Sequence, residues 1–236
     1  VMLVEAAPAL QDIQRATLGG TEVTWTQSVD ALPEQPIYVV ANEVFDALPI
    51  RQFIREGGAW RERQVGVVAG ELAFGLAPPA ALSMLESRLA DTQDGDLVEH
   101  CAAYGPMMAP VAARIAGHGG AALVVDYGDW PTQGDSFQAV HGHARADPLA
   151  TPGAADLTAH VDFKALAAQA APCAHSVLTP QGVFLERLGI TERAQRLADG
   201  LAGKDLDTHI AAHRRLTHPE EMGNLFKVLG LTPPGA

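Results

Sequence analysis

The chain has 236 residues, 47% hydrophobic and 19% charged, so it can bury the core of one large α/β domain and is not a disordered chain. Its 28 acidic and 16 basic residues give a formal charge of −12, which argues against nucleic acid as a partner, because phosphate-binding surfaces carry a basic excess. No apolar run approaches the roughly 20 residues that span a bilayer, and two cysteines are too few for a disulfide framework or a thiolate zinc site. We expect a cytoplasmic protein without a membrane span.

The first forty residues predict strands alternating with a helix. Residues 1–5 form a short apolar run closed by an acid, which is typical of a buried strand in a parallel sheet. Helical spacing follows over 9–18, and further strands are expected at 23–25 and 37–41. Because the glycine turn of a nucleotide-binding domain usually lies one strand earlier, we expect a first strand and a glycine-rich loop upstream of residue 1.

Residues 51–77 follow a different pattern. Short strands at 52–55, 59–68 and 71–76 are separated by glycine turns, which predicts an antiparallel meander inserted in a single domain, 1–236. A helix is expected at 78–90 and a short strand at 97–100.

The second half of the chain returns to the α/β pattern. Its clearest element is a buried strand at 121–128, and loops follow it with one short strand near 137–140. The remaining expected elements are helices at 106–116 and 161–170, a strand at 174–178, three short helices up to 216 and a last strand at 225–229.

Polar side chains follow two of these strands, at the edge where open parallel sheets bind ligands. Glu5 closes the opening strand, where an acid can accept both hydroxyls of a ribose or be a solvated loop acid. Asn42, Glu43 and Asp46 follow the strand at 37–41. Capping of a helix by Asn42, with acids in its first turn, explains part of this cluster but not all of it.

Other candidate positions carry weaker signals. Asp126 ends the strand at 121–128 and is either a site acid or a turn acid. His160 lies in a polar segment that opens a helix, where a structural role is the simpler reading. His141 and His143 have no third ligand nearby, so we expect no metal site.

Four segments, taken together, resemble the MidA-like family of S-adenosylmethionine-dependent methyltransferases. They are residues 41–53, 125–128, 155–163 and 223–229, and in this order and spacing the resemblance runs from residue 1 to about 231. The mitochondrial members of that family are complex I assembly factors that dimethylate an arginine of a core subunit.

The resemblance implies a class I methyltransferase fold, which is a Rossmann-like, mostly parallel seven-stranded sheet with one antiparallel strand and the inserted meander. It implies S-adenosyl-L-methionine as the cofactor, with Glu5 at the ribose, Ser28 near the adenine and Asn42 facing the methyl-transfer centre. The family's glycine-rich loop, which holds the methionine end, lies upstream of residue 1, so this chain alone is expected to bind the cofactor weakly.

An arginine acceptor requires carboxylates that hold its guanidinium bidentately. Glu43, Asp46 and Asp162 are the candidates.

The resemblance implies a protein substrate, with a complex I subunit as the candidate, and a mitochondrial location in a eukaryote. The sequence leaves open whether the protein forms a homodimer. Two alternatives stay open: a catalytically silent assembly protein with this fold, and an NAD-dependent oxidoreductase, since an acid after the second strand serves NAD equally.

Overall fold

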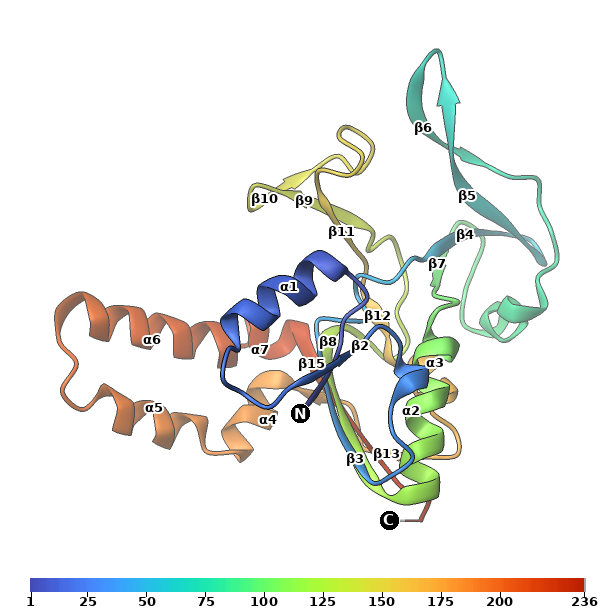
Figure 1. The fold of residues 1–236 in the computed structure, drawn as a ribbon. Helices are drawn as coiled ribbons and strands as arrows, with labels where there is room; N and C mark the ends of the chain where they lie inside the picture. The colour runs from blue at the N-terminus through green and yellow to red at the C-terminus, as the bar shows by residue number, and fades with distance from the viewer. Residues whose placement is uncertain (236) are drawn as a thin grey trace.

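The computed structural model, which describes residues 1–235, is built around a central six-stranded sheet (Figure 1). Its strands are β3 (Ile37–Asn42), β8 (Gly120–Asp129), β12 (Val161–Asp162), β13 (Ala174–His175), β14 (Thr179–Pro180) and β15 (Phe226–Thr232). Along one side, β8 pairs in parallel with β3 and, at its far end, with β12. On the other side β15 runs antiparallel to β8, β13 and β14. The chain is therefore an α/β protein whose sheet is mixed.

One face of this sheet carries the main core. Helices α2 (Tyr104–His118) and α3 (Phe163–Gln169) pack against it and against each other. Their apolar side chains meet those of β8 and β15, and the fully buried members include Ile115, Phe163, Leu166, Leu229 and Leu231. Each such side chain contributes roughly 1.5–3 kcal/mol relative to an exposed position, so this contact fixes the sheet on the helices.

The C-terminal helices lie near the first residues of β15, at the end opposite its pairing with β13. Helices α4 (Gln181–Arg187) and α7 (Met222–Leu225) pack beside that strand. Helices α5 (Ile190–Ala198) and α6 (Gly203–Thr217) form a hairpin that extends away from the sheet (Figure 1). Three helices were expected here, but α6 is 15 residues long rather than short, and α7 was not expected.

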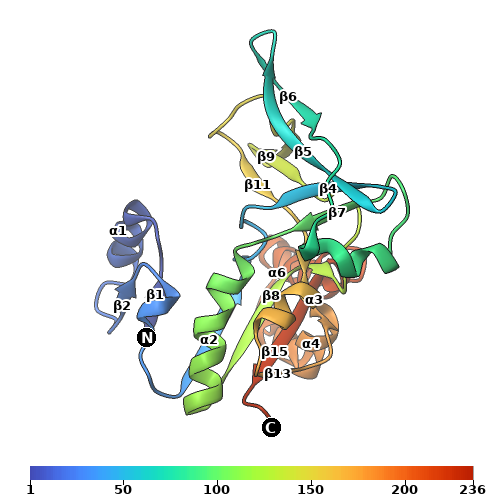
Figure 2. The same cartoon turned by 90° about the vertical axis from the view of Figure 1, so that its right-hand side faces the viewer.

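The N-terminal unit stands apart from the central sheet (Figure 2). Strand β1 (Met2–Val4) pairs in parallel with β2 (Thr24–Thr26), and α1 (Pro8–Thr17) connects them. Within the described residues these two strands make no pairing with β3. The elements expected here are confirmed, whereas a single continuous sheet is not formed.

The inserted sheet has four strands. Its order is β6 (Glu71–Leu76), β5 (Ala59–Val68), β4 (Arg51–Glu56) and β7 (Leu97–His100), all antiparallel. The strands at 59–68 and 71–76 have the predicted bounds. The sheet is nevertheless wider than the meander at 51–77, because the register of β7 places Val98 opposite Phe53, where both join a small buried core.

Three expected elements differ from the structure, and in two of them the backbone pairs with another strand instead. The helix predicted at 78–90 is a 3-10 helix over Ser83–Ala90, since Ala80 exchanges two backbone hydrogen bonds of 2.9 Å with Trp60. The helix predicted from residue 161 begins at Phe163, because Val161 and Asp162 pair with β8. The strand predicted at 174–178 is shortened to β13, and β14 begins only after that range, at Thr179.

A small third sheet occupies much of the stretch predicted as loop. It consists of β9 (Gln138–His141), flanked by β10 (Ala144–Ala146) and β11 (Asp156–Thr158), all antiparallel. Of these strands only β9 was expected.

Candidate functional site

The turn that follows β3 is fixed by a buried carboxylate from β8. The chain reverses at Glu43, whose φ is +51°. The next three backbone N–H groups donate to Oδ2 of Asp126, at 3.2 Å from Val44, 3.0 Å from Phe45 and 3.2 Å from Asp46. Burial raises the pKa of Asp126 to about 7, with a further contribution from Asp46, while the backbone N–H groups act in the opposite direction.

Asp46 is the buried acid of this turn and has one carboxylate oxygen in use. Its Oδ2 accepts a hydrogen bond from the hydroxyl of Tyr127, whereas its Oδ1 is buried and has no partner among the described residues. An unpaired buried carboxylate oxygen is costly, and a cationic donor would remove that cost. The backbone oxygen of Asp46 accepts from the N–H of Ala159 at 3.0 Å, which joins the segment before α3 to the turn.

The other two polar residues of the turn lie at the surface. Asn42 and Glu43 are both exposed, and Nδ2 of Asn42 donates to Oε1 of Glu43 at 3.2 Å. The structure therefore presents a carboxylate and an amide side by side at the carboxyl end of β3, next to the buried Asp46.

Glu5 lies two residues before Ala7, the N-cap residue of α1, and Ser28 caps the 3-10 helix Val29–Ala31. Glu5 follows β1, and its two carboxylate oxygens accept from the N–H of Ala7 at 2.9 Å and from Nε2 of Gln14 at 3.2 Å. Because a carboxylate oxygen has two lone pairs, each can accept one more hydrogen bond. The hydroxyl of Ser28 accepts from the N–H of Asp30 at 3.1 Å and donates to its carboxylate at 2.9 Å.

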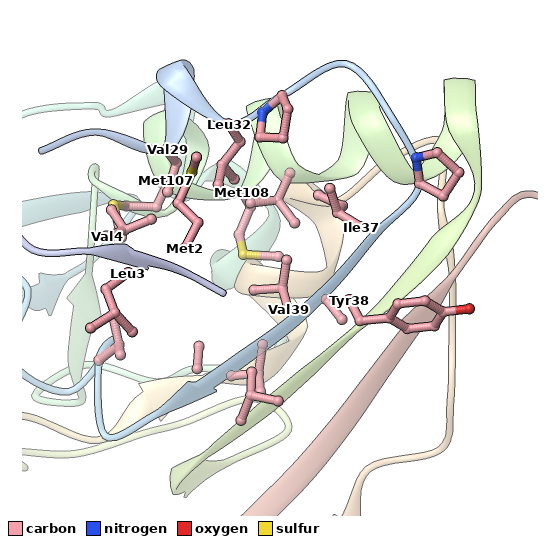
Figure 3. A pocket seen from close by; sticks show the side chains of 18 of the residues that line it. Met2, Leu3, Val4, Val29, Leu32, Ile37, Tyr38, Val39, Met107 and Met108 are labelled. Carbon is pink, nitrogen blue, oxygen red and sulfur yellow. The ribbon is translucent and has the colours of Figure 1, made fainter. Parts of the chain in front are cut away.

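An apolar cavity of about 440 Å³ separates the N-terminal unit from the central sheet (Figure 3). Its walls come from β1, β3, α2 and the loop between β2 and β3, and they include Met2, Leu3, Val4, Val29, Leu32, Ile37, Val39, Ala41, Val44, Phe45, Met107 and Met108. Glu5, Ser28 and Asn42 each adjoin one of these wall residues in sequence. The three predicted cofactor residues are thus sequence neighbours of wall residues of one cavity, although none of the three lines the cavity itself, and the turn carrying Asp46 contributes Val44 and Phe45 to its wall.

Asp162 lies elsewhere. Its Oδ1 accepts from the N–H of Ala165 at 2.9 Å, which begins α3, and its Oδ2 is 3.7 Å from Arg88. Burial raises its pKa, while Arg88 acts in the opposite direction. It borders a separate polar cavity of about 20 Å³. Its link to the turn is indirect: the hydroxyl of Tyr104 accepts from the N–H of Asp162 at 3.3 Å, and the ring of Tyr104 packs edge-on against Phe45.

Two residues at this edge were not singled out for their roles. Tyr127 holds Asp46, and its own ring packs edge-on against Phe226, with centroids 5.3 Å apart. Gly128 has a φ of +157°, and a Cβ there would stand 2.0 Å from the backbone oxygen of Val161, so only glycine lets β12 approach β8. The sequence signal for both was the run Asp126–Tyr127–Gly128 at a strand end.

Residues 1–235 contain neither a candidate membrane-spanning helix nor a candidate cluster of metal ligands. No helix in that range is long and apolar enough to cross a membrane. In the same range, no group of three or more His, Cys, Asp or Glu side chains is placed to hold a metal ion.

Comparison with known proteins identifies relatives over most of the chain. The family model described as "Putative S-adenosyl-L-methionine-dependent methyltransferase" matches residues 1–181. The mitochondrial protein arginine methyltransferase NDUFAF7 of Xenopus laevis is 31% identical over 265 residues, covering 99% of this chain and 59% of the relative. The NDUFAF7 protein of Danio rerio is 33% identical over 256 residues, covering 96% and 60%.

A solved structure agrees with the sequence relatives. A crystal structure from Burkholderia thailandensis, bound to S-adenosyl-homocysteine, superposes with a TM-score of 0.81 at 31% identity and covers 98% of this chain and 63% of that one. The chain thus spans about 60% of the length of the curated relatives that it matches. Because the family model covers well over half of the chain, the resemblance seen in the sequence is confirmed: the chain belongs to this family of S-adenosyl-L-methionine-dependent methyltransferases.

Proposed function

We propose that the intact protein is an S-adenosyl-L-methionine-dependent methyltransferase that modifies an arginine of a protein substrate. The observation that carries this proposal is the acidic turn after β3, where the buried Oδ1 of Asp46 lacks a partner beside the exposed Glu43. The names of the NDUFAF7 relatives and the S-adenosyl-homocysteine in the Burkholderia thailandensis structure support the same reaction.

The proposed fold is that of a class I methyltransferase, in which one more strand lies between β1 and β3. The backbone N–H groups of Ile37 and Glu43 donate to the backbone oxygens of Gly119 and Val125, on the β8 side of β3. Because N–H groups alternate in direction along a strand, the N–H groups of the even-numbered residues between them point to the other edge of β3, away from β8. The cavity lies along that edge and is lined with apolar side chains. An added parallel strand would fill it, and a glycine-rich loop after that strand would meet the carboxyl edge beside Glu5 and Asn42.

The three residues that adjoin the cavity wall in sequence fit the cofactor. We assign Glu5 to the ribose hydroxyls, because both of its oxygens keep a free lone pair, Ser28 to the neighbourhood of the adenine, and Asn42 to the methyl-transfer centre. The cofactor supplies a methyl group on a sulfonium, which is already a reactive donor. The protein then has to hold the acceptor in line and exclude water.

The acceptor would bind at the turn after β3. A guanidinium presents donors in a planar fork, which suits two carboxylates at one edge, and we assign Asp46 and Glu43 to this contact. Asp162 would support the site through Tyr104 rather than touch the acceptor. Two remaining proposals have different supports: the resemblance to the MidA-like family suggests a respiratory complex I subunit as the substrate, and the mitochondrial relatives suggest mitochondria as the compartment in a eukaryote, with cytoplasm otherwise.

Methyl transfer by the full-length protein tests this function. The protein is incubated with S-adenosyl-L-methionine carrying a labelled methyl group and a candidate complex I subunit, and the modified residue is located by mass spectrometry. Label on arginine supports the proposal. Cofactor binding without any transfer would favour a catalytically silent assembly protein, and label confined to other residue types would contradict the assigned acceptor.

A further inference from the structure

Asp126 makes an unusual set of contacts for an acid at a strand end. Its side chain is fully buried, and one oxygen accepts three successive backbone N–H groups from a turn 80 to 82 residues earlier in the chain. The other oxygen accepts from the N–H of Tyr127 at 2.9 Å. Both oxygens are therefore committed to backbone groups, and none of these contacts depends on a ligand.

A neighbouring acid on the same strand provides the contrast. Asp129 also accepts from the N–H of the following residue, Trp130, at 2.9 Å, but it is exposed and makes no hydrogen bond to the turn. Asp129 has the exposure and the single local hydrogen bond expected of an acid that only stabilises a turn. The additional burial and the three long-range bonds of Asp126 require another explanation.

The turn held by Asp126 carries the acids of the proposed acceptor site. Without a carboxylate at this place, three buried or half-buried N–H groups would lack partners, and an unpaired backbone N–H is strongly unfavourable. The same three bonds determine the direction in which the chain leaves Glu43 and therefore where Asp46 meets Tyr127.

We propose that Asp126 is a positioning residue, whose carboxylate fixes the turn from Glu43 to Asp46 and thereby sets the place of the acidic side chains at the sheet edge. Its effect on catalysis rests on the proposed function, whereas its hold on the turn does not. Asp126 touches neither cofactor nor acceptor in this arrangement and acts through the backbone of the turn.

Hydrogen exchange tests the hold on the turn without any substrate. In Asp126→Asn the amide group keeps the size of the carboxyl group but places an N–H₂ group against backbone N–H donors. At a pH above the pKa of Asp126, which is about 7, we expect the amides of residues 44–46 to exchange about tenfold faster or more, the loss typical of a hydrogen bond to a charged group, while peptides from α2 keep their rates. Asp129→Asn is the matched control and should leave the turn unchanged.

Wild-type exchange gives a measurement that does not depend on whether the variant folds. The amides of residues 44–46 should be protected in the wild type to a degree comparable with the amides of β8, although they belong to a turn. Fast exchange of these amides in the wild type, or a wild-type rate in Asp126→Asn, would overturn the proposal.

Kinetics of the full-length protein test the consequence. We expect Asp126→Asn to lower kcat for methyl transfer about tenfold or more, with the KM for S-adenosyl-L-methionine changed by about twofold or less, because the altered contact serves the acceptor side. A faster-exchanging turn with an unchanged kcat would overturn the positioning role. Absence of transfer by the wild type, with the exchange result intact, would instead reject the proposed function.

Discussion

The pH dependence of stability provides a direct test of the environment of Asp126. The pKa of this acid rises from 3.8 in its ordinary state to about 7 in the folded protein, first because it is buried and then because Asp46 lies close by. Between about pH 4 and 7 the folded protein therefore keeps a proton that the unfolded chain has released. The free energy of unfolding consequently falls as the pH rises through this window.

The size of the effect follows from the shift. A change of about 3 pH units corresponds to about 4 kcal/mol at 1.36 kcal/mol per unit. Asp126 is 0% exposed, so solvent does not screen this interaction. The neighbouring hydroxyl of Tyr104 on α2 does not titrate in this range, because burial raises its pKa well above the usual value. A change of this size is a large fraction of the 5–15 kcal/mol typical of a folded domain.

Urea unfolding, followed by circular dichroism at pH 5 and pH 8, measures this difference. The wild type should lose up to about 2.7 kcal/mol between these two values beyond the loss in Asp126→Asn, which has no carboxyl group to titrate, because about two units of the titration window lie above pH 5. The contributions of the other titrating groups to the pH dependence cancel when the two proteins are compared. The control Asp129→Asn should show the same pH dependence of the free energy of unfolding as the wild type. Equal pH dependence of the wild type and Asp126→Asn would refute the reasoning, because the four backbone hydrogen bonds would then offset burial completely.

Three further predictions concern the full-length protein and its parts. Asp46→Asn keeps the shape of the side chain but removes its charge, so methyl transfer to arginine should fall about tenfold or more while calorimetric cofactor affinity stays the same; wild-type rates would show that this carboxylate does not bind the acceptor. Glu5→Ala should weaken cofactor binding by about 1.5–3 kcal/mol, and unchanged affinity in the folded variant would remove Glu5 from the site. The chain of residues 1–236, with its mass verified, should bind the cofactor far more weakly than the full-length protein does, and tight binding would contradict the proposed added strand.

Several strands could be predicted from the sequence because short-range patterns of apolar and turn residues specify them. Alternation and glycine turns gave the bounds of the strands at 59–68 and 71–76, and a continuous apolar run gave the strand at 121–128 to within one residue at each end. The four family segments, which include the turn after β3, led to a family that the comparisons confirm. These signals could be read because hydrophobic period, turn chemistry and motif spacing act over short stretches of chain.

Contacts between side chains that are far apart in the sequence became visible only in the tertiary structure. The sequence left Asp126 open as a site acid or a turn acid, because its three hydrogen-bond partners stand about 80 residues away and meet it only when β8 and β3 lie side by side. Asp162 was grouped with Glu43 and Asp46 as a candidate for the acceptor site, yet packing places it beside Arg88 at the start of α3. Tyr38 and Val40 belong to the apolar run of the expected strand at 37–41, yet their side chains are 85% and 74% exposed, since no described residue covers that face of β3. Burial and long-range pairing depend on the whole arrangement of layers, which no local pattern in the sequence specifies.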